Sequence, residues 1–158
     1  MKTLQKIFYM TDEVWDKHSN PWSVWTRFAT LPFVIAAFWS IHYVGKFSVI
    51  PIFTSIVWLW LNPRLFSKPT FQTSWASKAV LGEKVWINED SDKFKAKHSL
   101  VLKFTTLISF SGLANLVWGV VNQDIHMTIL GTIILYIGKM WFLDRMVWIY
   151  DDYSALRK

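Results

Sequence analysis

The sequence predicts an all-α integral membrane protein with four transmembrane helices and two amphipathic helices on the cytoplasmic surface. Hydrophobic residues make up 53% of the 158 residues, whereas charged residues make up only 18%. The charges leave four long uncharged runs, at 28–45, 47–63, 104–123 and 125–138. A helix needs about 20 mostly apolar residues to cross a bilayer, and three of the runs meet this length. The fourth meets it if Lys139 reaches the headgroups or is paired.

Capping and helix-breaking residues suggest where each helix begins and ends. Asn20 is a good N-cap and Pro21 is tolerated in a first turn, so the first transmembrane helix is expected to begin there. Pro63 is expected to end the second. The single domain is therefore predicted to hold, in order, an interfacial helix, two transmembrane helices, a cytoplasmic segment and two more transmembrane helices, at 3–17, 21–44, 47–62, 63–100, 101–121 and 125–149.

The cytoplasmic segment is expected to contain the second interfacial helix, over residues 73–88, with Gly82 weakening it. Residues 88–97 carry charges of both signs and are expected to form a solvated turn. Small and polar residues at 109–115, in the third transmembrane helix, are of the kind that let membrane helices approach closely.

Basic residues predict the orientation in the membrane. Lys46 alone among the 17 Lys and Arg residues lies in a link expected on the outer side. The positive-inside rule then puts both termini and the segment 63–100 in the cytoplasm of a bacterial or archaeal cell, with the chain in the inner membrane. The eleven tryptophans share this bias, since only Trp39 and Trp118 are expected near the outer side. This indicates either an ordered cytoplasmic layer or simple anchoring of the two interfacial helices.

Composition and motifs exclude several classes of function. The chain has no cysteine, which excludes disulfides, thiol catalysis, iron–sulfur clusters and cysteine zinc sites. No glycine-rich nucleotide-binding motif and no nucleophile-elbow motif is present. The net charge of +6 needs no nucleic acid, because the positive-inside bias and anionic lipid account for it. No cofactor is predicted.

Polar residues from three separate stretches are expected at one depth, near the inner membrane surface. Charged groups are costly beside apolar surroundings and are therefore paired or functional. One interpretation is an ion-pair network that locks the helix ends, with Asp144 or Asp16 as a partner for Lys139. Another is a site for an anionic headgroup, held by arginines. The third is catalysis, with Asp16 and His18 as acid and base. The candidate ligand-binding residues are Arg27, Asn62, Arg64, Lys139, Asp144 and Arg145.

The four histidines show no metal-binding spacing. His42 and His126 are both expected at outer helix ends, where they could meet. They are the candidates for a metal or haem site, whereas interfacial hydrogen bonding is the usual role of such residues.

Four segments together resemble an uncharacterised family of small bacterial and archaeal polytopic membrane proteins, a domain of unknown function. They are W-D-K-H-S-N-P-W-S-V-W-T-R at 15–27, N-P-R-L-F at 62–66, L-G-E-K-V-W at 81–86 and K-M-W-F-L-D-R-M-V-W-I-Y-D-D at 139–152. The resemblance covers nearly the whole chain. It implies a single polytopic membrane domain and no known activity, substrate or cofactor.

The sequence therefore favours a small non-enzymatic membrane protein, an accessory or interaction subunit whose cytoplasmic layer binds anionic lipid headgroups. Because four helices bury little area on their own, a homo-oligomer or a larger membrane complex is expected. The alternative is a membrane-embedded enzyme acting on a lipid or isoprenoid substrate at the cytoplasmic interface.

Overall fold

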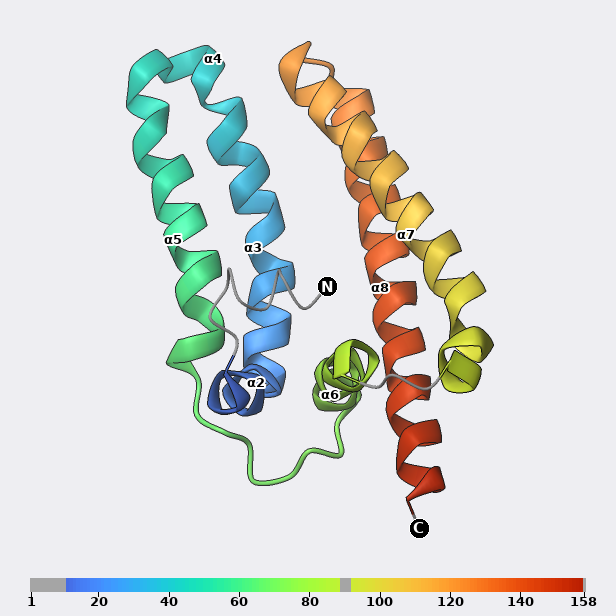
Figure 1. The fold of residues 1–158 in the computed structure, drawn as a ribbon. Coiled ribbons are helices and arrows are strands. Elements are labelled where there is room, and N and C mark those ends of the chain that lie inside the picture. Colours follow the sequence, from blue (N-terminus) through green and yellow to red (C-terminus); the bar gives the residue numbers. More distant parts are fainter. Residues whose placement is uncertain (1–10, 89–91, 158) are drawn as a thin grey trace.

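The computed structural model describes residues 11–88 and 92–157, and every regular element in these ranges is a helix (Figure 1). The elements are α2 (Asp12–His18), α3 (Pro21–Trp39), α4 (Ile41–Val44), the short 3₁₀ helix η1 (Gly45–Ser48), α5 (Val49–Leu65), α6 (Trp75–Asn88), α7 (Asp92–Val121) and α8 (Ile125–Leu156). Most of the interfacial helix predicted at 3–17 lies outside the described residues. Its last part is helical, within α2.

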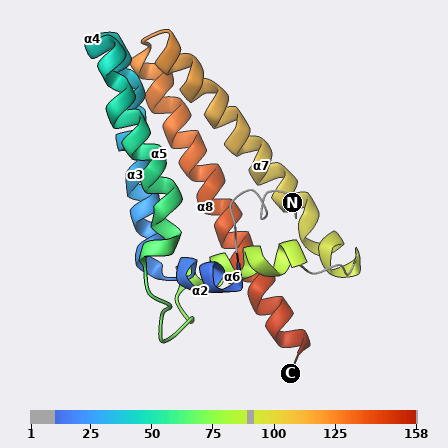
Figure 2. The ribbon, with the colours of Figure 1, turned by 60° about the vertical axis from the view of Figure 1, so that its left-hand side comes forward.

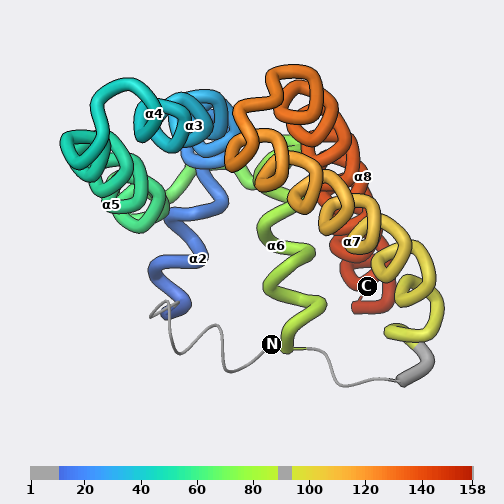
Figure 3. The backbone as a smooth tube through the Cα atoms, turned by 90° about the horizontal axis from the view of Figure 1, so that it is seen from above, coloured from blue at the N-terminus to red at the C-terminus, as the bar shows by residue number. Residues whose placement is uncertain are grey.

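Two antiparallel helical hairpins form the long axis of the molecule. In one, α3 and α5 lie side by side and are joined through α4 and η1; in the other, α7 and α8 are joined by a tight turn at 122–124 (Figures 1 and 2). Gln123 adopts a positive φ of 57° in that turn. Helices α2 and α6 run crosswise at the opposite end of both hairpins (Figure 3). Helices α2 and α6 therefore lie at the same end of the molecule.

Three segments are long and apolar enough to cross a membrane: Pro21–Leu65, Phe94–Val121 and Ile125–Leu156. The first of these folds back on itself as the hairpin of α3 and α5. These segments fit a multi-pass membrane protein. Helix α5 continues to Leu65 with Pro63 inside it, so the second apolar helix ends three residues later than the predicted 62.

Glycines explain why α7 and α8 form the most closely packed pair. A Cβ on Gly112 would overlap the backbone of Leu135, and one on Gly131 would overlap the backbone of Leu116. Each glycine thus accepts a leucine position of the opposite helix, as small residues do where membrane helices approach closely. The predicted close approach at 109–115 is confirmed for Gly112.

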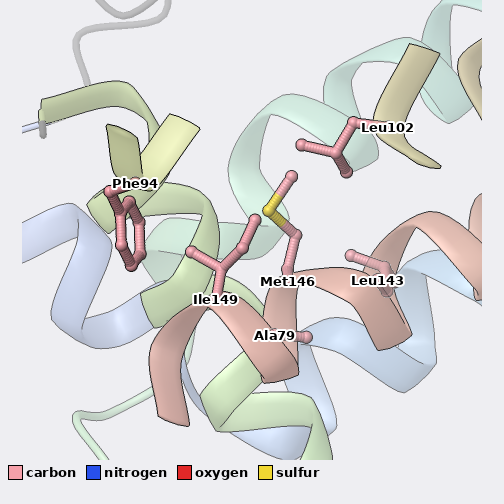
Figure 4. Close-up of a cluster of buried hydrophobic side chains, with 6 residues drawn as sticks. All are labelled: Ala79, Phe94, Leu102, Leu143, Met146 and Ile149. Atoms are coloured by element: carbon pink, nitrogen blue, oxygen red, sulfur yellow. The ribbon is translucent and has the colours of Figure 1, made fainter. Parts of the chain in front are cut away.

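Helix α6 packs on α8 by the same means. A Cβ on Gly82 would overlap the carbonyl of Met146, so the glycine lets the two backbones meet. Gly82 does not interrupt α6, which is continuous through this residue. Around this contact lies a buried hydrophobic cluster formed by α6, α7 and α8, with Met146 of α8 at its centre (Figure 4). Its members are Ala79, Phe94, Leu102, Leu143, Met146 and Ile149.

The prediction of a solvated turn at 88–97 is wrong for residues 92–97, which are helical, whereas residues 89–91 lie outside the described residues. Helix α7 begins at Asp92, nine residues before the predicted 101. Phe94, His98 and Leu102 recur every four residues and are buried against α8. Lys97 adds an ion pair to Asp152, with Nζ 2.6 Å from Oδ2 of the carboxylate. Burial of one face and pairing of the charges extend the helix beyond the apolar run.

Candidate functional site

A cavity of about 300 Å³ lies where the two hairpins meet the crosswise helices. Its volume is at the lower end of the range of small-molecule sites. Five helices contribute side chains: α2, α3, α5, α6 and α8. The lining residues are His18, Val24, Arg27, Phe28, Leu31, Leu59, Val80, Glu83, Leu135, Tyr136, Lys139 and Leu143.

The cavity is charged on one side and apolar elsewhere. Arg27 from α3 and Lys139 from α8 supply two positive charges, and Glu83 from α6 supplies one negative charge. The Lys139 ammonium lies 4.9 Å from the centre of the Phe142 ring. The remaining walls are mainly leucine, valine and aromatic side chains. This combination suits a molecule with an anionic head and an apolar body.

Arg27 is held in place by His18. Its Nη1 lies 2.6 Å from Nε2 of His18, nearer than to Nδ1 of the same ring, at 3.2 Å. A guanidinium has no acceptor, so Arg27 must donate and Nε2 must carry the lone pair. The proton of the neutral imidazole is therefore on Nδ1, 3.3 Å from the Ser23 hydroxyl.

From His18, a chain of hydrogen bonds runs through Ser23, Asn62 and Thr26, which lie outside the cavity lining. Ser23 Oγ donates to Asn62 Oδ1 at 2.9 Å, and Asn62 Nδ2 donates to Thr26 Oγ1 at 2.8 Å. Thr26 in turn donates to the carbonyl of Trp22 at 2.6 Å. His18, Ser23 and Asn62 are all buried. A fully paired chain of this kind fixes side-chain positions, because an unpaired buried polar group costs about 1–3 kcal/mol.

Burial, together with the positive charges of Arg27 and Lys139, lowers the pKa of His18 to about 3. Both the burial and the neighbouring cations disfavour the imidazolium. His18 is thus neutral at physiological pH, in agreement with the hydrogen bonds.

The turn between α2 and α3 sets the position of His18 and Arg27. Asn20 caps α3 by accepting from the Trp22 N–H at 2.9 Å, and its amide donates to the Ser67 carbonyl at 2.9 Å. The Ser77 hydroxyl of α6 donates to the Ser19 carbonyl at 2.7 Å. The turn is therefore tied both to the segment after α5 and to α6. These bonds account for several polar residues of the W-D-K-H-S-N-P segment.

The two hairpins meet beside the cavity. Tyr136 of α8 donates to the Phe28 carbonyl of α3 at 2.6 Å, and the two rings stack with centroids 5.9 Å apart. At the far end, His42 lies with Nε2 3.1 Å from the Val120 carbonyl. These two hydrogen bonds join one hairpin directly to the other.

The structure brings together some of the predicted site residues. His18, Arg27 and Lys139 line the cavity, and Asn62 lies directly behind its wall. The other candidates lie outside the lining. Arg64 lies over the Trp60 ring, 4.1 Å from its centre, and Arg145 donates to the Lys97 carbonyl at 3.3 Å.

The two acidic candidates have partners of their own. Asp16 pairs with Lys68 at 2.7 Å, and Asp144 accepts from the Trp75 indole at 3.1 Å. Neither of these acidic residues lines the cavity. Sequence reasoning missed Glu83 and Tyr136. The signal available for Glu83 was its place in the L-G-E-K-V-W segment; Tyr136 had none, because it lies within an uncharged run.

The candidate metal ligands have ordinary polar surroundings. His42 bonds to the Val120 carbonyl, and His126 is an exposed residue in the first turn of α8. Over the described ranges, no group of three or more His, Asp or Glu residues has metal-binding geometry.

Comparison with known proteins identifies one family. No curated protein and no solved structure matches the chain significantly. The model of a family of unknown function, DUF6653, matches residues 2–157. This match covers nearly the whole chain, as the four sequence segments led us to expect. The protein is therefore a member of the family of unknown function DUF6653.

Proposed function

We propose that the protein is a four-pass membrane protein that binds an anionic lipid in the cavity between α3 and α8. Helices α3, α5, α7 and α8 would each cross the bilayer. At 1.5 Å per residue, even the two shorter helices, of 19 and 17 residues, extend about 28 and 26 Å, close to the hydrocarbon thickness of about 30 Å. The basic residues put α2, α6 and both termini on the cytoplasmic side.

The proposal rests on one observation. Two cationic side chains, Arg27 and Lys139, line the same cavity, and its other walls are mostly apolar. Arg27 lies about 9 Å along α3 from Pro21, within reach of the headgroups. A phosphate bound there would accept hydrogen bonds from a guanidinium, whose fork geometry suits it, and from an ammonium. The acyl chains would lie against Phe28, Leu31 and Leu135.

Binding explains the chemistry of the site better than catalysis does. An enzyme with Asp16 and His18 as acid and base would need both groups free to exchange protons at the substrate. Asp16 is paired with Lys68, and both ring nitrogens of His18 have partners. We therefore retain a non-enzymatic role, as an accessory subunit in a homo-oligomer or a larger membrane complex.

Native mass spectrometry of the protein, purified gently from its membrane, tests the binding proposal. We expect wild-type protein to retain an anionic phospholipid, and the Arg27→Gln/Lys139→Gln double variant to retain at least tenfold less. Lys139→Gln alone is the safer variant, because Lys139 is exposed and Arg27 also holds His18. We expect it to retain several-fold less lipid than the wild type.

The matched control is Arg64→Gln, which removes a positive charge from α5 outside the cavity lining and is expected to retain lipid as the wild type does. Equal retention by the wild type and the folded Lys139→Gln and double variants would refute the proposed site.

A further inference from the structure

We propose that the cavity selects a lipid whose headgroup carries one negative charge, a phosphodiester or a carboxylate, over a phosphate monoester that carries two. This inference rests on the proposed function and specifies the ligand of the same site. It follows from the charges that face the cavity from each surrounding helix and from the hydrogen bonds that keep one of the lining groups neutral.

Among the described residues, three charged side chains line the cavity. Helix α3 contributes Arg27, α8 contributes Lys139 and α6 contributes Glu83. Helix α5 contributes only the apolar Leu59. With a neutral imidazole from α2, the wall carries a formal charge of +1.

The hydrogen bonds of His18 indicate that its imidazole is neutral. Nε2 accepts a hydrogen bond from Arg27, and Nδ1–H points to Ser23, whose own proton goes to Asn62. A second proton, on Nε2, would set an N–H against the Arg27 guanidinium at the short 2.6 Å contact, and the guanidinium offers no lone pair. The imidazole therefore adds no positive charge for a ligand to neutralise.

Other charges near the site are already matched. Lys84, the neighbour of Glu83, pairs with Asp12 at 2.8 Å, and Asp16 pairs with Lys68. In the described parts of the chain, no ion pair joins Glu83 to Arg27 or Lys139. Glu83 thus remains a negative charge on the wall of the cavity itself.

The net charge of the filled site determines which ligand is favoured. Charges removed from water are expensive unless they are neutralised, so the favoured ligand brings the total charge of the filled site to zero. A singly charged headgroup does so. A doubly charged one leaves a net charge of −1 and approaches the Glu83 carboxylate.

A competition experiment tests the selectivity. Purified protein in detergent is mixed with equal amounts of phosphatidylglycerol, a phosphodiester, and phosphatidic acid, a monoester. The bound lipids are then compared by native mass spectrometry at pH 8, where the monoester is mainly doubly charged. A separate arm with oleate tests whether a carboxylate binds as the phosphodiester does. We expect the wild type to prefer phosphatidylglycerol at least fivefold.

Glu83→Gln is the decisive variant, because it raises the charge of the wall to +2 with almost no change in shape. We expect it to abolish or reverse the preference. The matched control is Asp144→Asn, which removes one negative charge from α8 outside the cavity and is expected to keep the wild-type preference.

The outcomes separate the two proposals. If the wild type binds lipid through Arg27 and Lys139 but prefers phosphatidic acid, or if Glu83→Gln keeps the wild-type preference, the charge-selectivity inference is overturned and the proposed function stands. If Lys139→Gln and the double variant retain lipid as well as the wild type, the proposed function itself fails.

Discussion

His18 shows how a single side chain can be both structural and placed at the site. The sequence marked it as a possible acid or base because it lies near charged residues at the expected membrane surface. In the structure it is buried, accepts from Arg27 and donates to Ser23. Its arrangement is that of a positioning residue, which sets the direction of the Arg27 guanidinium toward the cavity.

The buried neutral His18 predicts a dependence of stability on pH. Its pKa is lowered to about 3 in the folded protein, whereas the unfolded chain titrates near the ordinary value of about 6.5. Between these values the unfolded state binds one more proton, so stability is fully present above about pH 6.5 and is lost as the pH falls toward 3. We expect the wild type to lose about 2–3 kcal/mol between pH 6.5 and 4.5 from this residue.

Thermal unfolding in detergent at a series of pH values measures this effect, with His18→Gln as the control. The control cannot take up a proton at this position, so its Tm should change less between pH 6.5 and 4.5. Identical pH profiles for the two proteins would show that His18 is not buried as a neutral imidazole.

Some site residues were predictable from the sequence and others were not. Arg27 and Lys139 were predictable because each lies next to an apolar run, where a charged side chain is costly and is therefore paired or functional. Glu83 did not, because an acidic residue in a polar segment is usually solvated. Arg64 and Arg145 were grouped with Arg27 by depth alone. Depth does not determine which helix faces meet, and both arginines contact aromatic rings instead.

At the scale of the elements, glycine determines where the crosswise helix α6 can approach α8. Gly82 faces the carbonyl of Met146 so closely that a Cβ would overlap it. In an ordinary helix, replacing Gly with Ala stabilises by about 1 kcal/mol. At this position we expect Gly82→Ala to destabilise the protein by about 2–4 kcal/mol, because α6 must move away from α8.

The free energy of unfolding in detergent, measured with a denaturant, gives the sign of this effect. Gly45→Ala is the comparison variant, because its Cβ would meet nothing within 4 Å and its cost arises only from the φ of 53°. Because ψ of Gly45 is −126°, outside the left-handed helical region, we expect that cost to be about 1–3 kcal/mol. A stabilising Gly82→Ala would contradict the close packing of α6 on α8.

The boundaries of the elements show what hydropathy can and cannot predict. Uncharged runs located most of α3, α5 and α7 and the first part of α8, because the membrane requires long apolar stretches. They missed the first turns of α7, where Phe94, His98 and Leu102 face α8 although lysines lie between them. Helical spacing of the buried residues, rather than mean hydropathy, was the informative signal in that segment.

For the whole molecule, the arrangement of the hairpins creates the cavity. Each hairpin is a close pair in sequence, and short links between apolar runs predict such pairs. The contact of α3 with α8 is different, because Tyr136 and Phe28 lie 108 positions apart in the chain. Nothing in either segment predicts this contact, so the cavity could not be predicted although three of its polar residues were.

The most direct test of lipid binding is to locate the lipid along the chain. A photoreactive phosphatidylglycerol, with its reactive group on the upper part of one acyl chain, would be added to the reconstituted protein and crosslinked. Peptide mass spectrometry would then identify the labelled positions. We predict labelling of the cavity walls at Leu31 and Leu135 that unlabelled phosphatidylglycerol competes away and that Lys139→Gln weakens. Labelling confined to outward-facing residues such as Phe53 and Leu107, and unchanged in Lys139→Gln, would contradict lipid binding in the cavity.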